Sequence, residues 1–71
     1  MTTLDIPALV RELRQRYGLT QEQFAQKVGV TYSTVNHWEN GKRTPQPYLV
    51  KRLLELRADL DERDSAETGN P

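Results

Sequence analysis

QEQFAQKVGVTYSTVNHWEN, residues 21–40, carries the apolar spacing of two short helices joined by a tight turn. The apolar positions of the first helix are Phe24, Ala25 and Val28, and those of the second are Val35 and Trp38. Residues spaced three or four positions apart lie on one face of a helix. Gly29 lies between the two sets, where a sharp turn takes a positive φ at little cost. The stretch therefore predicts a rigid corner of two helices packed through these faces.

The second helix of this corner keeps a polar outer side, formed by Ser33, Asn36, His37 and Asn40. Polar side chains on a helix held by a rigid corner can hydrogen-bond base edges in the DNA major groove. The alternative is a solvated face that contacts nothing. His37 is the one histidine of the chain, and no metal-ligand set or catalytic partner is placed beside it. The pattern therefore favours DNA recognition over catalysis.

Two segments, LTQEQFAQKVGV (residues 19–30) and VNHWENGKRTP (residues 35–45), resemble the helix-turn-helix of the phage Cro/repressor family, also called the xenobiotic-response-element type. The resemblance extends from Leu9 to about Leu54, roughly two thirds of the chain. It implies an all-α DNA-binding domain whose recognition helix, about Tyr32–Asn40, lies in the major groove.

Side chains on and around the corner have expected roles. The expected base contacts are Tyr32, Ser33, Thr34, Asn36 and His37, because amides, hydroxyls and aromatic rings suit base edges and the thymine methyl. The expected phosphate contacts are Gln21, Thr31, Asn40, Lys42 and Arg43, with Thr31 alternatively serving only as a helix cap. The resemblance implies that Gln21 also braces the recognition helix. It further implies a partly buried structural ion pair between Arg14 and Glu39; the alternative is two exposed charges.

Length and composition limit the possible functions. The 71 residues make one domain, with no cysteine for a disulfide or thiolate metal site and no apolar run long enough to span a membrane. The net charge is zero, but residues 1–52 carry eight Lys/Arg against four acidic residues, whereas residues 53–71 carry two against six. The part expected to bind DNA is therefore basic, and the acidic tail is expected to aid solubility and temper non-specific binding.

Capping signals divide the chain into four helices. The expected helices are Ile6–Tyr17 after the cap Asp5, a second after the cap Thr20, a third from the cap Thr31 to Gly41, and a fourth from near Pro47 to about Asp64. Members of the family usually have a short fourth helix followed by a fifth. Here one extended fourth helix and no fifth are expected, because no glycine or proline interrupts residues 48–64. Residues 1–64 are expected to form the domain, and residues 65–71 a disordered polar tail.

Four leucines of the fourth helix step by four, three and four positions, which is a heptad seam. They are Leu49, Leu53, Leu56 and Leu60. Val50, Leu53 and Leu54 already supply a face for the core, so Leu56 and Leu60 are expected to lack cover without a fifth helix. The seam is therefore expected to form the interface of a weak homodimer. The alternative is that it only completes the core of the domain.

Together these features predict a sequence-specific DNA-binding transcriptional regulator, a repressor that binds a two-fold site in duplex DNA as a dimer. One alternative is an antitoxin-type regulator with a toxin as its protein partner. Another is an adaptor that keeps the fold without binding DNA, although an adaptor would more often expose apolar residues on the outer side of the third helix. No feature predicts an enzyme, and no cofactor or metal is expected. The expected location is cytoplasmic, on nucleoid DNA.

Overall fold

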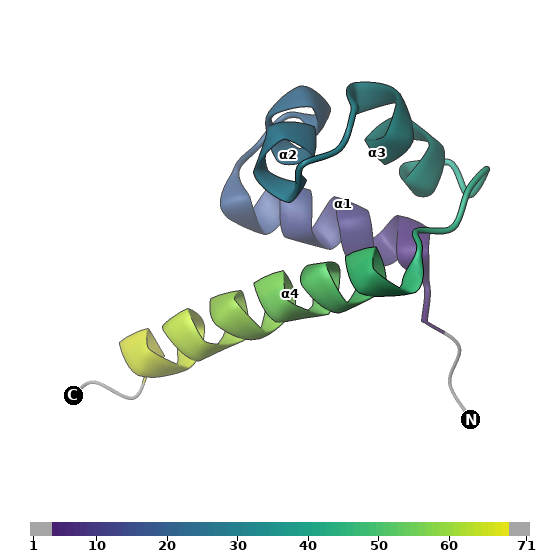
Figure 1. Ribbon diagram of the computed structural model, residues 1–71. Coiled ribbons are helices and arrows are strands. Elements are labelled where there is room, and N and C mark those ends of the chain that lie inside the picture. Colours follow the sequence, from purple (N-terminus) through teal and green to yellow (C-terminus); the bar gives the residue numbers. More distant parts are fainter. Residues whose placement is uncertain (1–3, 69–71) are drawn as a thin grey trace.

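The computed structural model describes residues 4–68, which form four α-helices and no strand. The helices are α1 (Ile6–Tyr17), α2 (Gln21–Val28), α3 (Tyr32–Glu39) and α4 (Pro47–Thr68). α1 lies in the middle, with α2 and α3 on one side of it and α4 on the other (Figure 1). The predicted all-α fold of four helices, without a fifth in the described residues, is confirmed.

Side-chain caps set the residues at which the first three helices begin. Asp5 Oδ1 accepts a backbone N–H of the first turn of α1 at 3.2 Å. Thr20 Oγ1 accepts the Gln23 N–H at 3.1 Å, and Gln23 Oε1 accepts the Thr20 N–H at 3.0 Å, which completes a capping box. Thr31 Oγ1 accepts the Thr34 N–H at 3.2 Å. The three predicted caps are therefore confirmed, and each satisfies a backbone donor that its helix leaves unpaired.

Gly29 forms the corner between α2 and α3. Its φ of 93° lies in the left-handed region, which residues with a Cβ rarely adopt. An added Cβ would meet no atom within 4 Å, so the need for glycine is conformational and not steric. The N–H groups of Gly29 and Val30 both donate to the Ala25 carbonyl, at 2.8 and 2.9 Å. These bonds close the end of α2 and direct the chain into α3.

The corner packs on α1 through the faces that its apolar spacing predicts. The largest fully buried side chains of the domain are Trp38, Phe24, Leu13, Leu53, Val10 and Val35. Ala25 is also buried, whereas Val28 is only partly buried at the edge of the core. Because Val35 and Trp38 of α3 face this core, the opposite side of α3 faces solvent.

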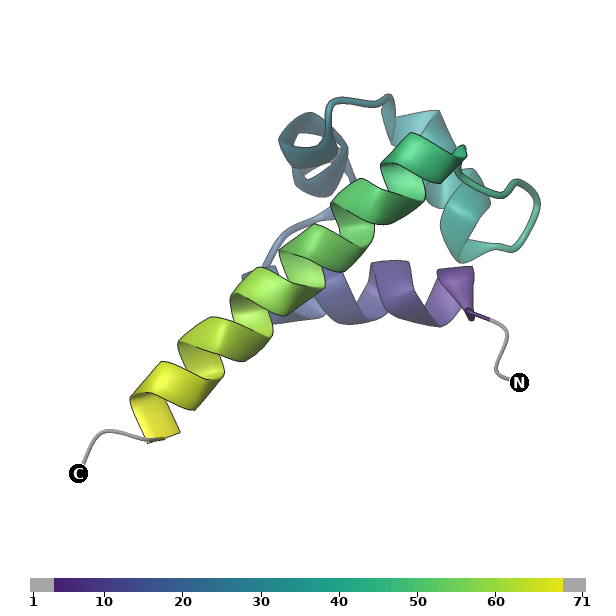
Figure 2. The ribbon, with the colours of Figure 1, turned by 60° about the horizontal axis from the view of Figure 1, so that its bottom comes forward.

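α4 is one continuous helix of 22 residues that ends at Thr68, one turn later than the predicted end near Asp64. Its last turns extend beyond the other helices (Figures 1 and 2). The first helix breaker in the sequence after Pro47 is Gly69, which accounts for the later end. Part of the predicted disordered tail is thus helical, and residues 69–71 lie outside the described residues. Neither α4 nor another described helix is long and apolar enough to cross a membrane.

The leucine seam of α4 lies inside the domain. Leu53, Leu56 and Leu60 are 0%, 6% and 7% exposed, and Leu49 is half-buried. Cover comes from α1, whose Tyr17 hydroxyl donates to the Leu56 carbonyl at 3.2 Å. The prediction that Leu56 and Leu60 lack cover is therefore wrong. The physical reason is that α4 is long enough to pack along α1, so α1 covers both leucines and no fifth helix is needed to bury them.

Candidate nucleic-acid interface

α3 presents polar and aromatic groups on the side opposite the core. Tyr32 is 51% exposed. Ser33 and Asn40 are exposed, and Asn36 and His37 are partly buried. These positions recur at helical spacing, so they share the outer side of α3. A hydroxyl, an imidazole and an aromatic ring on such a side can contact base edges and thymine methyl groups.

Two threonines at the start of α3 are engaged within the protein. Thr31 caps the helix, and its hydroxyl oxygen lies 2.9 Å from that of Thr34, with which it shares a hydrogen bond. Thr34 is also partly buried. Among the predicted base contacts, Thr34 is therefore less available than Tyr32 or Ser33. Thr31, predicted as a phosphate contact or a cap, serves as the cap.

A chain of side-chain amides crosses the outer side of the corner. Asn40 Nδ2 donates to Asn36 Oδ1 at 3.1 Å, and Asn36 Nδ2 donates to Gln21 Oε1 at 3.3 Å. Gln21 is the first residue of α2, so the chain ties the start of α2 to the middle and end of α3. The bracing contact that the resemblance implies for Gln21 is thus made with Asn36, a residue for which the sequence predicted a base contact.

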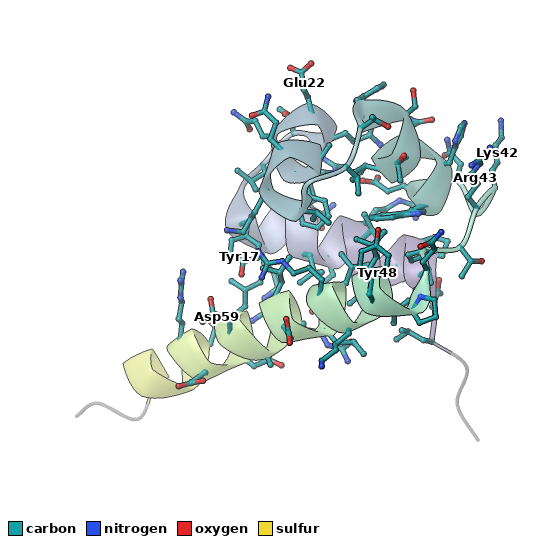
Figure 3. All side chains as sticks on the ribbon, viewed as in Figure 1. Tyr17, Glu22, Lys42, Arg43, Tyr48 and Asp59 are labelled. Carbon is teal, nitrogen blue, oxygen red and sulfur yellow. The ribbon has the colours of Figure 1, made fainter. Side chains whose placement is uncertain are left out.

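Basic side chains follow α3 in the loop that leads to α4. Lys42 and Arg43 are exposed and project away from the helices in Figure 3. The Lys42 N–H donates to the His37 carbonyl at 2.9 Å, which fixes the start of the loop against the end of α3. Cations held beside a groove-reading helix are placed to contact phosphates on its flank.

An open hollow of about 590 Å³ lies on the other flank of α3. Its lining residues are Arg14, Thr20, Gln21, Glu22 and Tyr32, from α1, the start of α2 and the start of α3. The unpaired N–H groups at a helix start carry partial positive charge. Glu22 supplies the one carboxylate of the lining, and its side chain points outward in Figure 3. α3 thus lies between two positions suited to phosphate, the hollow and the Lys42–Arg43 loop.

Charge is separated along the molecule. Lys42 and Arg43 lie at one end, and Asp59 lies toward the other in Figure 3. The long dimension is 43 Å, whereas charges in physiological salt are screened over about 8 Å. The acidic residues of the C-terminal half of α4 therefore bring the net charge of the chain to zero without cancelling the positive field around the loop. The basic loop and the acidic part of α4, which the sequence separates along the chain, thus also lie apart in space.

Arg14 and Glu39 form a two-point ion pair between α1 and α3. Arg14 Nε donates to Glu39 Oε2 at 2.8 Å, and Arg14 Nη2 donates to Glu39 Oε1 at 3.2 Å. The Glu39 side chain is 5% exposed and that of Arg14 is 24% exposed. The hydrogen bond to Glu39 raises the pKa of Arg14; burial opposes this rise and the Glu39 charge adds to it. The pair fixes the C-terminal end of α3 on α1.

Arg11 is a contributor that the sequence reasoning missed. Its Nη2 donates to the Glu39 backbone carbonyl at 3.0 Å, and its Nε lies 3.8 Å from Glu39 Oε1. Arg11 and Arg14 are three positions apart on α1, so they share a face. That spacing was the available signal for a second cation near Glu39.

A smaller groove of about 250 Å³ lies between α3, the following loop and the start of α4. Val30, Trp38, Pro45 and Leu49 contribute to its lining. Tyr48 also lines it and is 67% exposed, more than any other large apolar residue that the structure describes. This groove is a candidate contact surface separate from the outer side of α3.

Residues 10–56 match the family described as helix-turn-helix. The chain is 44% identical over 45 residues to an uncharacterized HTH-type transcriptional regulator of Methanothermobacter thermautotrophicus, across 63% of this chain and 65% of that protein. It is 40% identical over 47 residues to an uncharacterized HTH-type transcriptional regulator of Archaeoglobus fulgidus, across 66% of this chain and 67% of that protein. A third such regulator, from Bacillus subtilis, is 44% identical over 45 residues, across 62% of this chain and 32% of that protein. The match thus spans just under two thirds of the first relative and about a third of the last. No solved structure matches the chain.

Proposed function

Because the chain belongs to the helix-turn-helix family, we propose that it binds duplex DNA with α3 in the major groove and regulates transcription. The observation that carries this proposal is the division of α3 into two sides. Val35 and Trp38 are 0% and 2% exposed in the core, while Tyr32 is 51% exposed on the outer side. A helix fixed so firmly on one side can present the other in a defined orientation to base edges.

The proposed contacts fall into two groups. Tyr32, Ser33 and His37 contact bases, because they lie on the outer side of α3 and their side chains make no hydrogen bond to other described residues. The proposed phosphate contacts are Gln21, Asn40, Lys42 and Arg43, on the two flanks of α3. Phosphate contacts set affinity and register, whereas base contacts set sequence preference. The proposed regulatory effect is repression, since a domain bound across a promoter excludes other proteins from it.

Ser33→Ala and Arg43→Ala should affect DNA binding in different ways. Ser33→Ala should cost about 1–3 kcal/mol on the preferred site and little on random duplex DNA. Arg43→Ala should weaken binding to both DNAs equally and reduce the slope of log affinity against log salt by about one unit. Fluorescence anisotropy on both duplexes across a salt series measures these effects.

The matched control for Arg43→Ala is Arg63→Ala. Arg63 is an exposed cation in the C-terminal half of α4, where it pairs with Asp59, so its removal should leave the salt slope nearly unchanged. Identical behaviour of the Ser33 and Arg43 variants on the two DNAs would contradict the division into base and phosphate contacts. Equal changes of the salt slope in Arg43→Ala and Arg63→Ala would contradict the proposed contact between the Lys42–Arg43 loop and DNA phosphates.

The regulator is proposed to bind a two-fold site as a weak homodimer. Two half-sites lie about 34–36 Å apart along the duplex, and one α3 reads only one of them. The buried leucine seam is not available in this conformation. The second copy is instead proposed to contact the groove beside Tyr48, because this residue exposes apolar surface next to the DNA-proximal loop.

Tyr48→Ala should abolish cooperative binding to paired half-sites and leave binding to a single half-site unchanged. The reason is the loss of an exposed aromatic side chain at the proposed contact, with no change in α3. Gel-shift assays on single and paired sites, together with sedimentation, measure the effect. Glu62→Ala, an exposed change on α4 outside the groove, serves as the control. Cooperativity retained by Tyr48→Ala would place the contact elsewhere.

A further inference from the structure

Asn36 has both edges of its side-chain amide engaged within the protein. Its Oδ1 accepts from Asn40, and its Nδ2 donates to Gln21 Oε1. The two hydrogen-bond partners of Asn36, Gln21 and Asn40, are both proposed phosphate contacts, one on each flank of α3. A free Nδ2/Oδ1 pair is what an asparagine needs to bind adenine in two-point fashion. In this structure one donor and one acceptor of that pair are already bound within the protein, and the Asn36 side chain is partly buried.

We propose that Asn36 is a positioning residue that holds Gln21 with its donor edge toward the DNA backbone, and that it does not read bases. This inference rests on the proposed function, because it concerns how the phosphate contact of Gln21 is made. It replaces the base contact that the sequence predicted for Asn36.

The direction of the amide chain determines what Gln21 offers to a phosphate. Asn36 occupies Gln21 Oε1, so the Nε2 group with its two N–H donors is the part of the Gln21 amide left for an outside ligand. A phosphate oxygen only accepts, so it needs that edge and is repelled by the carbonyl edge. The reversed chain, in which Gln21 donates to Asn36, would turn the carbonyl outward.

Two features favour the observed direction once DNA is bound. Successive donations from Asn40 to Asn36 and from Asn36 to Gln21 polarise one another in the same sense. Gln21 also begins α2, where partial positive charge attracts an anion. The proposed Gln21–phosphate bond would therefore add a third donation in line with the two in the protein. Through its hydrogen bonds to Asn40 and Gln21, Asn36 connects the proposed phosphate contacts on the two flanks of α3.

The test is a double-variant cycle of Asn36→Ala and Gln21→Ala, measured on preferred and random duplexes. Each single variant should weaken binding to both duplexes by roughly tenfold, the effect of losing a hydrogen bond to a charged group. Because Asn36 acts mainly through Gln21, the effect of Asn36→Ala should be much smaller when Gln21 is already alanine, and what remains should come from the release of Asn40. Base preference and salt slope should stay unchanged, since no base contact and no cation is removed. Thermal melts verify that each variant is folded.

A second measurement examines the amide chain without DNA. In the nuclear magnetic resonance spectrum, Asn36→Ala should shift the side-chain NH₂ signal of Gln21 and leave that of Gln26, an exposed glutamine of α2, unchanged. An unshifted Gln21 signal would overturn the inference. A changed base preference in Asn36→Ala, or an undiminished effect in the Gln21→Ala background, would also overturn it while leaving the proposed function intact. Failure of the unmodified protein to bind any duplex would overturn both.

Discussion

Trp38→Ala should lower the free energy of unfolding by about 3–5 kcal/mol, the usual cost of removing a buried large aromatic side chain. Trp38 is 2% exposed and is the largest fully buried side chain of the domain. A loss of this size is comparable to the whole stability of a small domain. Each kcal/mol lowers Tm by about 4–8 °C in a domain of this size. Thermal denaturation followed by circular dichroism should therefore show a much lower Tm or no folded baseline.

Tyr32→Ala is the matched control on the same helix. Tyr32 is half exposed, and surface changes away from special contacts usually alter stability by less than about 0.5 kcal/mol. The pair of variants tests which side of α3 faces the core. If Trp38→Ala melted at the temperature of Tyr32→Ala, α3 would not be packed through Trp38, and its assigned outer side would be wrong as well.

Arg14→Ala should destabilise the fold by about 3 kcal/mol, because it leaves a buried carboxylate without its two-point partner. The Glu39 side chain is 5% exposed, and Arg11 approaches its carboxylate only to 3.8 Å. The raised pKa of Arg14 means that the contribution of this group is fully present below the ordinary alkaline pKa of a guanidinium and is lost only above it. The effect should therefore be constant around neutral pH in urea denaturation.

Arg16→Ala is the control for this prediction. Arg16 makes ion pairs with Glu12, Asp61 and Asp64, and the acidic side chains are 45% to 64% exposed. The Arg16 side chain is 26% exposed and its acidic partners are more exposed, so solvent screens these pairs; this variant should lose much less stability than Arg14→Ala does. The double variant Arg14→Met with Glu39→Leu should recover most of the stability lost in Arg14→Ala. Equal stability of Arg14→Ala and Arg16→Ala would contradict a structural role for the buried pair.

Local signals in the sequence predicted the corner well, because its determinants lie a few residues apart. Thr20, Gln23 and Thr31 are caps whose partners are within the same turn. Gly29 is required by its own φ, and the spacing of Val35 and Trp38 fixes which side of α3 is buried. None of these inferences depends on how distant segments pack.

The features that were mispredicted depend on distant contacts or on side-chain direction. The leucine seam looked uncovered because its cover comes from α1, some 40 residues earlier in the chain, as the 39-residue separation of Tyr17 and Leu56 illustrates. For Asn36, helical position correctly placed it on the outer side of α3. Its engagement by Gln21 depends on how closely α2 approaches, which spacing alone does not give. Arg11 was missed for the same reason.

Selection of bound duplexes from a random pool tests the central claim, that the outer side of α3 reads bases, most directly. The unmodified protein should enrich one sequence with two-fold related half-sites, and Ser33→Ala should relax the preference at a defined base pair in each half. Arg43→Ala should bind more weakly and enrich the same sequence. A pool that remains random after selection with the folded, unmodified protein would contradict sequence-specific recognition by α3.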